Sequence, residues 1–432
     1  MTLRVFEAFA GVGTQRMALE RLGIKHEVVG IAEVDEFAIN SYAAIHEEVE
    51  EVVDVSEDEM RDYLRKLNIP LNDQGKPKNP RGKKLKNVYT SSKKVRNLGD
   101  ISKINVENVP DHDLFTYSFP CQDISLAGEL GGLKKGSGTR SSLLWECKRV
   151  IDTKKPKYLL MENVKNLVGK KFKPHFEEWL KYLEALGYTT YWEVLNAKNY
   201  GVPQNRERVF AVSVLGEHEP YVFPKPIKLE KRLKDVLEDE VAERYYLDNE
   251  RAQQLTATIT DEKDMAGVIE PERILGIFDK ENRTHQSGSV YNKDKIAPTL
   301  DTMQGGWRQP SIIDEPKMIE GIPIKNATEQ GYLIAKDGDG VDLAYPTSNT
   351  RRGRVQENIS QTLTTDDSKG VVEQYRIRKL TPLECWRLMG ISDEDFYKAQ
   401  AVNSNTQLYK QAGNAIVVDV LVAIFRELFS NR

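Results

Sequence analysis

The order of apolar and amphipathic segments over roughly the first two hundred residues constrains the fold more than any other feature. Short apolar runs alternate with helix-like stretches, and we expect each run to form a strand. Parallel strands need a long crossover between them, so this alternation predicts a parallel sheet wrapped by helices. The predicted strands span residues 3–9, 28–32, 114–118, 158–161 and 209–214.

The character of the sequence changes after about residue 216. Pro220, Pro224 and Pro226 predict a linker, and a Thr- and Gly-rich stretch with short β-prone runs follows. A helical pattern returns at Leu380 and continues to the end of the chain. A chain of 432 residues is long enough for two domains. We therefore predict one domain from residues 1–215 and 378–432, and a smaller one from residues 216–377.

Charge is distributed unevenly between residues 42 and 96. Residues 42–64 have a helical pattern that is strongly acidic from Glu47 to Glu59. Residues 74–96 contain nine Lys or Arg and no acidic residue, and their Gly, Pro and Asn predict a loop or mobile insertion. Two interpretations of this insertion stay open: a solvated loop that offsets the acidic helix, or a clamp for nucleic-acid phosphates.

Composition excludes several classes of protein. The three cysteines, Cys121, Cys147 and Cys385, form no C-x-x-C pair, which argues against a disulfide framework and a cysteine-rich zinc site. No apolar run approaches the roughly 20 residues of a membrane span, and the first residues lack the pattern of a signal peptide. We expect a cytoplasmic protein with no metal and no membrane contact.

Residues 9–13, Phe-Ala-Gly-Val-Gly, follow the first predicted strand and precede a helix. Glycines at such a turn let the backbone approach a nucleotide-like ligand, although they also fit a simple tight turn. Arg16 replaces the third glycine of the dinucleotide motif, which argues against an NAD site. Glu33, at the end of the second strand, could accept both ribose hydroxyls, and Asp100 could bind an adenine amino group; each could also be a solvated acid.

A second group of polar residues follows the other strands. Cys121 lies just past one predicted strand, at the edge where open α/β sheets bind ligands, and a glycine-rich stretch that could close as a lid follows it. Glu162 emerges from the next apolar strand. Arg206 and Arg208 open the strand at 209–214, and their spacing of two predicts that they point the same way, as a clamp for a phosphate or base carbonyl. A lone cysteine is more often an inert core residue, but the strand edge and the lid favour a nucleophile here. The other three residues could be solvated surface charges.

In combination these segments resemble the cytosine-5 DNA methyltransferases from end to end. Eight motifs in the family's order carry the resemblance: Phe-x-Gly-x-Gly at Phe9, the acid Glu33, Pro-Cys-Gln at Pro120, the segment from Arg140 to Leu143, Glu-Asn-Val at Glu162, Gln-x-Arg-x-Arg at Gln204, the segment from Arg378 with Glu384 and Gly390, and Gln-Ala-Gly-Asn-Ala at Gln411. Val34 departs from the pattern, since family members often carry Trp there against the adenine ring.

The resemblance implies a Rossmann-like, S-adenosylmethionine-dependent methyltransferase domain of the α/β class, with a smaller, β-rich target-recognition domain. It implies methyl transfer to C5 of a flipped-out cytosine in a specific duplex sequence, with S-adenosylhomocysteine as the product. Cys121 would attack C6, Glu162 would bind N3, Arg208 would hold O2, and Arg206 would position a phosphate or lower the pKa of the thiol. The residues expected at the cofactor are Phe9, Ala10, Gly11, Val12, Gly13, Glu33, Val34, Asp100, Ile101, Pro120, Leu143, Asn414, Ala415 and Ile416.

The implied partner is double-stranded DNA. We expect a monomer, and a cognate restriction enzyme is a candidate partner. Two alternatives stay open: an RNA cytosine-5 methyltransferase acting on tRNA, and a catalytically silent DNA-binding paralogue. The intact set of Cys121, Glu162, Arg206 and Arg208 argues against silence. A thiol protease is disfavoured because none of the six histidines has a motif that links it to Cys121.

Overall fold

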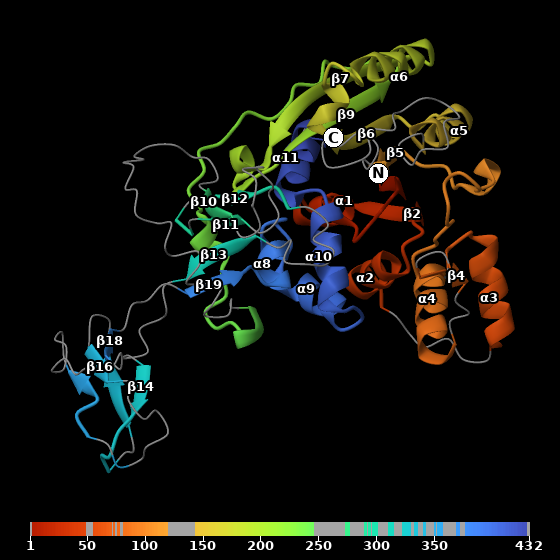
Figure 1. Ribbon diagram of the computed structural model, residues 1–432. Helices are drawn as coiled ribbons and strands as arrows, with labels where there is room; N and C mark the ends of the chain where they lie inside the picture. Colours follow the sequence, from red (N-terminus) through yellow and green to blue (C-terminus); the bar gives the residue numbers. More distant parts are fainter. Residues whose placement is uncertain are drawn as a thin grey trace.

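The computed structural model shows a mixed α/β body with a smaller β-rich region to one side (Figure 1). The residues that it describes are 2–48, 55–70, 72–73, 76–77, 81–119, 143–245, 273–276, 289–291, 293–294, 296–300, 310–314, 322–329, 332–335, 340–342, 350, 352–356, 369–371 and 376–429.

Six strands in the described part of the chain form the central sheet, in the order β2-β1-β5-β6-β9-β7. All five predicted strands are confirmed, and β7 was not predicted. β2, β1, β5 and β6 pair in parallel, whereas β9 runs antiparallel to both β6 and β7. The predicted, mainly parallel sheet is therefore confirmed. The strands are β1 (Leu3–Ala8), β2 (His26–Ala32), β5 (Leu114–Tyr117), β6 (Tyr158–Val164), β7 (Tyr188–Asn196) and β9 (Glu207–Leu215).

Helices cover both faces of this sheet because its strands are apolar on both sides. Along β1, Leu3 and Val5 belong to one hydrophobic cluster and Phe6 and Ala8 to another. The first cluster includes residues of α1, α8, α10 and α11, and the second includes residues of α5 and α6. These helices, together with α9 beside α2, are α1 (Thr14–Arg21), α2 (Glu36–His46), α5 (Leu144–Lys154), α6 (Lys173–Ala185), α8 (Pro382–Arg387), α9 (Asp393–Gln400), α10 (Asn405–Asn414) and α11 (Val418–Phe429).

The prediction of a loop for residues 74–96 was wrong over most of its length. Residues 82–94 form the helix α4 (Gly82–Lys94), which packs against α2 and against α3 (Glu57–Lys66). Leu85, Val88 and Tyr89 lie at helical spacing, and all three are buried in one cluster. The prediction missed this apolar face because lysines dominate the composition of the segment. Residues 42–64 likewise contribute to two helices, α2 and α3, rather than to one.

The β-rich character of the second region is confirmed. One sheet has the order β10-β11-β13-β19, a second pairs β14 with β15, and a third has the order β17-β16-β18. β12 pairs with β8 (Gln204–Asn205) of the first region. The strands of the second region are β10 (Arg273–Gly276), β11 (Ser289–Tyr291), β12 (Ala297–Pro298), β13 (Ser311–Asp314), β14 (Ile322–Lys325), β15 (Tyr332–Ala335), β16 (Gly340–Asp342), β17 (Val355–Gln356), β18 (Lys369–Val371) and β19 (Arg376–Lys379).

The segment after β9 stays close to the first region. Tyr221, Leu233, Val236 and Tyr245 are buried in the same cluster as α11. The Tyr221 hydroxyl lies 3.4 Å from the carbonyl oxygen of Ile424. The boundary at residue 216 stays a prediction, and these contacts tie residues 221–245 to the larger body.

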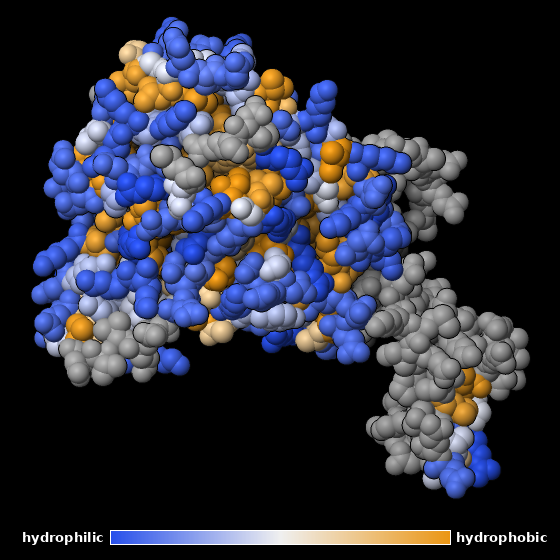
Figure 2. Space-filling view, turned by 180° about the vertical axis from the view of Figure 1, so that it is seen from behind, coloured by the Kyte–Doolittle hydropathy of each residue, from blue (hydrophilic) through white to orange (hydrophobic). Residues whose placement is uncertain are grey.

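The shorter elements of the described chain complete the fold. They are the strands β3 (Asn72–Asp73) and β4 (Lys76–Pro77), and the 3-10 turns η1 (Val106–Asn108), η3 (Lys165–Val168), η4 (Ala197–Tyr200), η5 (Leu233–Val236) and η6 (Glu243–Tyr245). The face seen from behind is hydrophilic over much of the main body (Figure 2). No helix in the described residues is long and apolar enough to cross a membrane.

Candidate active site

Several of the predicted site residues in the described part of the chain lie at the carboxyl ends of the parallel strands. β1 leads into residues 9–13, which we call the Gly loop, and β2 leads into Glu33. β5 ends shortly before Phe119, and Glu162 lies near the end of β6. Because these strands are parallel neighbours, their ends meet at one edge of the sheet, where such folds bind ligands.

The Gly loop turns through three residues with positive φ, namely Phe9 at 56°, Gly11 at 58° and Gly13 at 81°. Among the described residues, leaving out Gly11 and its two chain neighbours, no atom lies within 4 Å of the position that a Cβ on Gly11 would take. The backbone at Gly11 is therefore open to a ligand. Of the remaining loop residues predicted at the cofactor, Ala10 and Val12 are buried.

Glu33 fixes the Gly loop to the end of β2. Its Oε2 accepts from the Gly11 amide at 2.9 Å, and its Oε1 accepts from the amides of Val34 and Asp35 at 2.7 and 2.9 Å. Burial raises the pKa of this carboxyl, and the nearby charge of Asp35 adds to the shift. A carboxylate has about four lone-pair sites, so Glu33 retains capacity to accept from a ligand hydroxyl. Its role toward ribose stays a prediction.

Asn97 is a structural residue of this site that the sequence analysis missed. Its Oδ1 accepts from the amides of Glu33 at 3.1 Å and Gly99 at 2.9 Å, and its Nδ2 donates to the Glu33 carbonyl at 3.0 Å. The side chain is buried and so joins the ends of two segments. One of them holds Asp100, whose Oδ1 accepts from Ser102, and the buried Ile101. A polar residue just before a Gly-Asp turn was the available signal.

Cys121 and Pro120 lie outside the described residues, and so does Arg140. The structure describes the chain up to Phe119, which is buried. The Phe119 carbonyl accepts from Nδ2 of Asn163 at 2.9 Å. Asn163, next to Glu162 on β6, thus holds the backbone two residues before Cys121. Leu143, where the described residues resume, is half-buried and precedes α5.

Glu162 is nearly buried, with 8% of its surface exposed. Burial raises the pKa of its carboxyl, while the positive charges of Arg208 and Arg206 oppose that shift. Nε of Arg208 lies 3.2 Å from Oε1 of Glu162. The antiparallel pairing of β6 with β9 brings them together, since Val164 lies opposite Arg208. A carboxyl with a raised pKa beside a cationic donor can both bind and protonate a ring nitrogen.

Arg206 and Arg208 have different hydrogen-bond partners in the protein, and their role as a clamp for a ligand stays a prediction. Arg206 precedes β9, so the alternation of a strand does not apply to the pair. Its guanidinium donates to the carbonyls of Leu300 at 2.7 Å and of Gly413 and Ala415 at 2.9 Å each. Its side chain joins the second region to the segment that runs from the end of α10.

That segment holds the last three residues predicted at the cofactor. Asn414 ends α10 and is exposed, whereas Ala415 and Ile416 are buried. Val34 is half-buried and follows Glu33 at the other side of the site. Among the residues that the structure describes, no group of three or more His, Cys, Asp or Glu is arranged to hold a metal ion.

Comparison with known proteins decides the family. Residues 78–430 match the model of the C-5 cytosine-specific DNA methylases. The chain belongs to this family. It is thus an enzyme of the DNA (cytosine-5-)-methyltransferase type, and the recognition made from its motifs is confirmed.

Proteins similar to this methylase occur in bacteria and in phages. It is 41% identical to the type II methyltransferase M2.ScrFI of Lactococcus lactis subsp. cremoris, over 100% of both chains. It is 40% identical to the orphan methyltransferase M.SssI of Spiroplasma monobiae, over 69% of this chain and 79% of that one. The Entamoeba histolytica methyltransferase EhMeth has a similar fold, with a TM-score of 0.55 at 14% identity over 100% of this chain and 99% of that one. The methylase therefore has the fold of solved methyltransferases.

Proposed function

We propose that this methylase transfers a methyl group to C5 of a cytosine in a specific sequence of duplex DNA, through a covalent bond between Cys121 and C6. The observation that carries the proposal is the pairing of Glu162 and Asn163 on β6. Glu162 supplies a buried carboxyl with a raised pKa, and Asn163 holds the Phe119 carbonyl beside the segment that leads to Cys121. Nucleophile and acid would thus stand on neighbouring strand ends.

The ring chemistry explains why both groups are needed. C5 of cytosine is a weak nucleophile until a thiolate adds to C6 and makes C5 enamine-like. As Cys121 forms the bond to C6, electrons move toward N3, and a proton on Glu162 stabilises them there. Arg208, bonded to Glu162, would hold O2 of the base. After C5 has accepted the methyl group, a base removes the C5 proton and the C6–S bond breaks, which releases the Cys121 thiolate.

The Gly loop fits S-adenosylmethionine, which supplies the methyl group when bound. The open backbone at Gly11 allows close approach, and Glu33 can accept from ribose hydroxyls. Asp100 and Ile101 would contact the adenine side, and Asn414 to Ile416 would close the site. With Val34 at the place of the family's Trp, the adenine ring loses a stacking partner, and we expect weaker cofactor binding than in relatives with Trp.

The target base must leave the duplex, because a stacked cytosine does not expose C6 to a nucleophile. Flipping a base costs a few kcal/mol, which contacts to the opened DNA offset. We propose that residues 216–377 read the sequence, so a graft of another recognition region there should move the methylated site. A monomer acting in the cytoplasm, with a restriction enzyme as candidate partner, completes the proposal.

The deciding experiment is methyl transfer from labelled S-adenosylmethionine to a plasmid and to tRNA, followed by bisulfite sequencing of the plasmid. We expect label in DNA only, at cytosines within one short sequence. Label in tRNA instead would establish the RNA alternative. No transfer to either, with DNA binding intact, would establish the silent paralogue.

A further inference from the structure

The last turn of α2 lies directly against the Gly loop. Nε2 of His46 is 3.1 Å from the carbonyl oxygen of Val12, and the His46 side chain is 1% exposed. A carbonyl oxygen only accepts, so Nε2 carries the proton in this hydrogen bond. A Cβ on Gly13 would lie 2.4 Å from Nε2 of His46 and 2.7 Å from the Tyr42 ring. Loop and helix are therefore packed without space between them.

The opposite end of α2 also holds the loop. Glu33 and Asp35 precede the helix, and Asp35 caps it by accepting from the Phe37 amide at 2.9 Å. Glu33 binds the Gly11 amide, whereas His46 binds the Val12 carbonyl. The Ala10–Gly11 peptide is thus held through its N–H and the Val12–Gly13 peptide through its C=O, from opposite ends of one helix. These two bonds flank the Gly11–Val12 peptide and restrict the direction in which it points.

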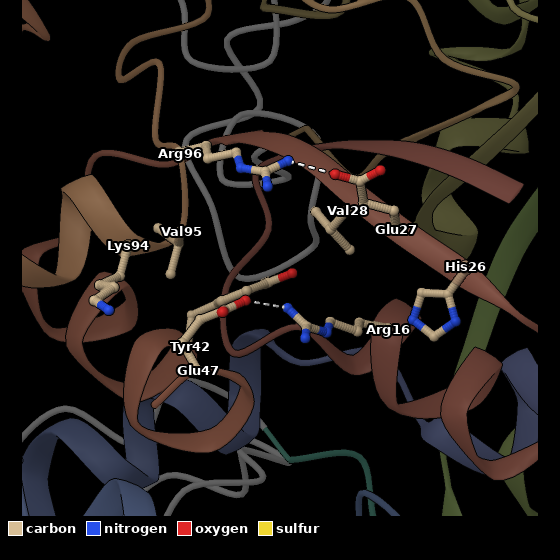
Figure 3. A pocket seen from close by; sticks show the side chains of 9 residues that line it. All are labelled: Arg16, His26, Glu27, Val28, Tyr42, Glu47, Lys94, Val95 and Arg96. Atoms are coloured by element: carbon tan, nitrogen blue, oxygen red, sulfur yellow. Dashed lines mark hydrogen bonds and ion pairs between the residues drawn. The ribbon is translucent and has the colours of Figure 1, made fainter. Parts of the chain in front are cut away.

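His46 is itself held by groups of α1 and α2. Its ring centroid lies 4.6 Å from that of Tyr42, whose hydroxyl donates to Oε2 of the buried Glu7 at 2.7 Å. Arg16 donates to the His46 carbonyl at 3.0 Å. It also donates to Glu47 at 2.6 Å (Figure 3). Nδ1 of His46 faces Oε1 of Glu20 at 3.6 Å. A side chain whose ring and both nitrogens have close neighbours can fix the loop more precisely than a flexible one.

We infer that His46 is a positioning residue for the cofactor: its Nε2 proton holds the Val12 carbonyl and so orients the Gly loop for S-adenosylmethionine. This inference rests on the proposed function, since it takes the Gly loop as the cofactor site. His46 acts through the loop backbone and not on the reacting atoms. Its loss should therefore weaken cofactor binding and leave the chemical step nearly unchanged.

The test compares His46→Leu with His46→Gln. Leucine removes the donor, whereas the glutamine amide can place an N–H near the position of Nε2. One lost hydrogen bond with a buried carbonyl left unpaired should raise the Kd for S-adenosylmethionine about tenfold. We expect His46→Leu to raise the Kd and KM for the cofactor by that factor with kcat within about twofold, and His46→Gln to restore most of the affinity.

His26→Leu is the matched control. His26 lines a polar cavity of about 230 Å³ together with Arg16 and Tyr42 (Figure 3). Its Nδ1 lies 2.7 Å from the carbonyl oxygen of Ile24. This variant should bind the cofactor like the wild type. Thermal melts without cofactor check that all variants fold, and if His46→Leu fails to fold, the affinity of His46→Gln against wild type and an Asn variant replaces it as the test.

The outcomes separate the inference from the function. Equal cofactor affinity in wild type, His46→Leu and His46→Gln would overturn the positioning role while leaving the proposed function intact. A loss in kcat with unchanged cofactor KM would also overturn it. Absence of S-adenosylmethionine binding in the wild type would instead overturn the proposed function.

Discussion

Two carboxylates at the same edge of the sheet are surrounded in different ways. Glu33 accepts hydrogen bonds from three backbone amides and is part of the frame that includes Asn97 and the Gly loop. Glu162 is more deeply buried, and among the described residues Arg208 is the cationic side chain that contacts it. Protein amides take up most of the accepting capacity of Glu33, whereas burial raises the pKa of Glu162 and so favours its protonated form. This contrast is what the proposed roles require, with Glu33 binding the cofactor and Glu162 taking part in the reaction.

Among these predictions, Cys121→Ser should have the largest effect on turnover. We expect turnover to vanish, because a serine alkoxide is far harder to form than a thiolate, while affinity for cofactor and DNA stays within a few fold. The measurements are methyl transfer and equilibrium binding on the same preparation. A normal rate would eliminate the covalent mechanism.

Glu162→Gln should slow methyl transfer by at least about a hundredfold, the scale of general acid catalysis. The pH dependence gives a second check. Because burial raises the pKa of Glu162, the protonated acid persists to higher pH than in an exposed glutamate, and the wild-type rate should fall as pH rises through that raised pKa. The rate of the Gln variant, which has no such proton, should not show this fall with rising pH. A loss of less than a few fold would remove Glu162 from the reaction.

Arg206 and Arg208 should separate stability from catalysis. Arg206→Met leaves the carbonyls of Leu300, Gly413 and Ala415 without their donor, and we expect the free energy of unfolding to fall by about 2–4 kcal/mol. Arg208→Met should cost less, because Glu162 can take up a proton, yet it should reduce turnover more. Urea unfolding and initial rates of both variants measure the contrast; the reverse order would assign the clamp role to Arg206.

The smallest effect concerns the basic face of α4. Lys83 and Lys94 are exposed, and each phosphate that a lysine neutralises adds about 0.9 to the slope of log affinity against log salt. If the helix contacts DNA, Lys83→Ser with Lys94→Ser should flatten this slope by up to about two units and leave the methylated sequence unchanged. Lys181→Ser, an exposed lysine of α6, is the control. Parallel salt titrations would leave α4 as a packing helix with solvated lysines.

The strands that could be predicted from the sequence are those made of continuous apolar runs. Strands β1, β5 and β6 are nearly continuous buried runs, and all were expected. Strand β7 was missed because Thr189, Trp192 and Glu193 along it are exposed, so it has neither an apolar run nor a clean alternation. Helix α4 was missed because the lysines dominated its composition, although the spacing of Leu85, Val88 and Tyr89 was present.

Site residues divide in the same way. Motifs identified Glu33, Glu162 and Arg208, whose side chains the structure brings to one sheet edge. Asn97 and Asn163 were given no role, since an asparagine that bonds backbone groups reveals its purpose only when the distant segments are in place. The backbone partners of Arg206 could not be predicted for the same reason, because its three carbonyl acceptors lie far away in sequence.

The packing of α1 against α11 has a consequence for synthesis. Met17 and Leu19 of α1 are buried in one cluster with Leu421 and Phe425 of α11, and the two helices are in contact. A chain emerging from the ribosome presents α1 early, but its apolar partner appears only after the whole recognition region has been translated. Domains generally fold as units during translation, so the catalytic body must wait with this surface uncovered. Chaperone binding to the nascent chain should therefore persist until α11 is released.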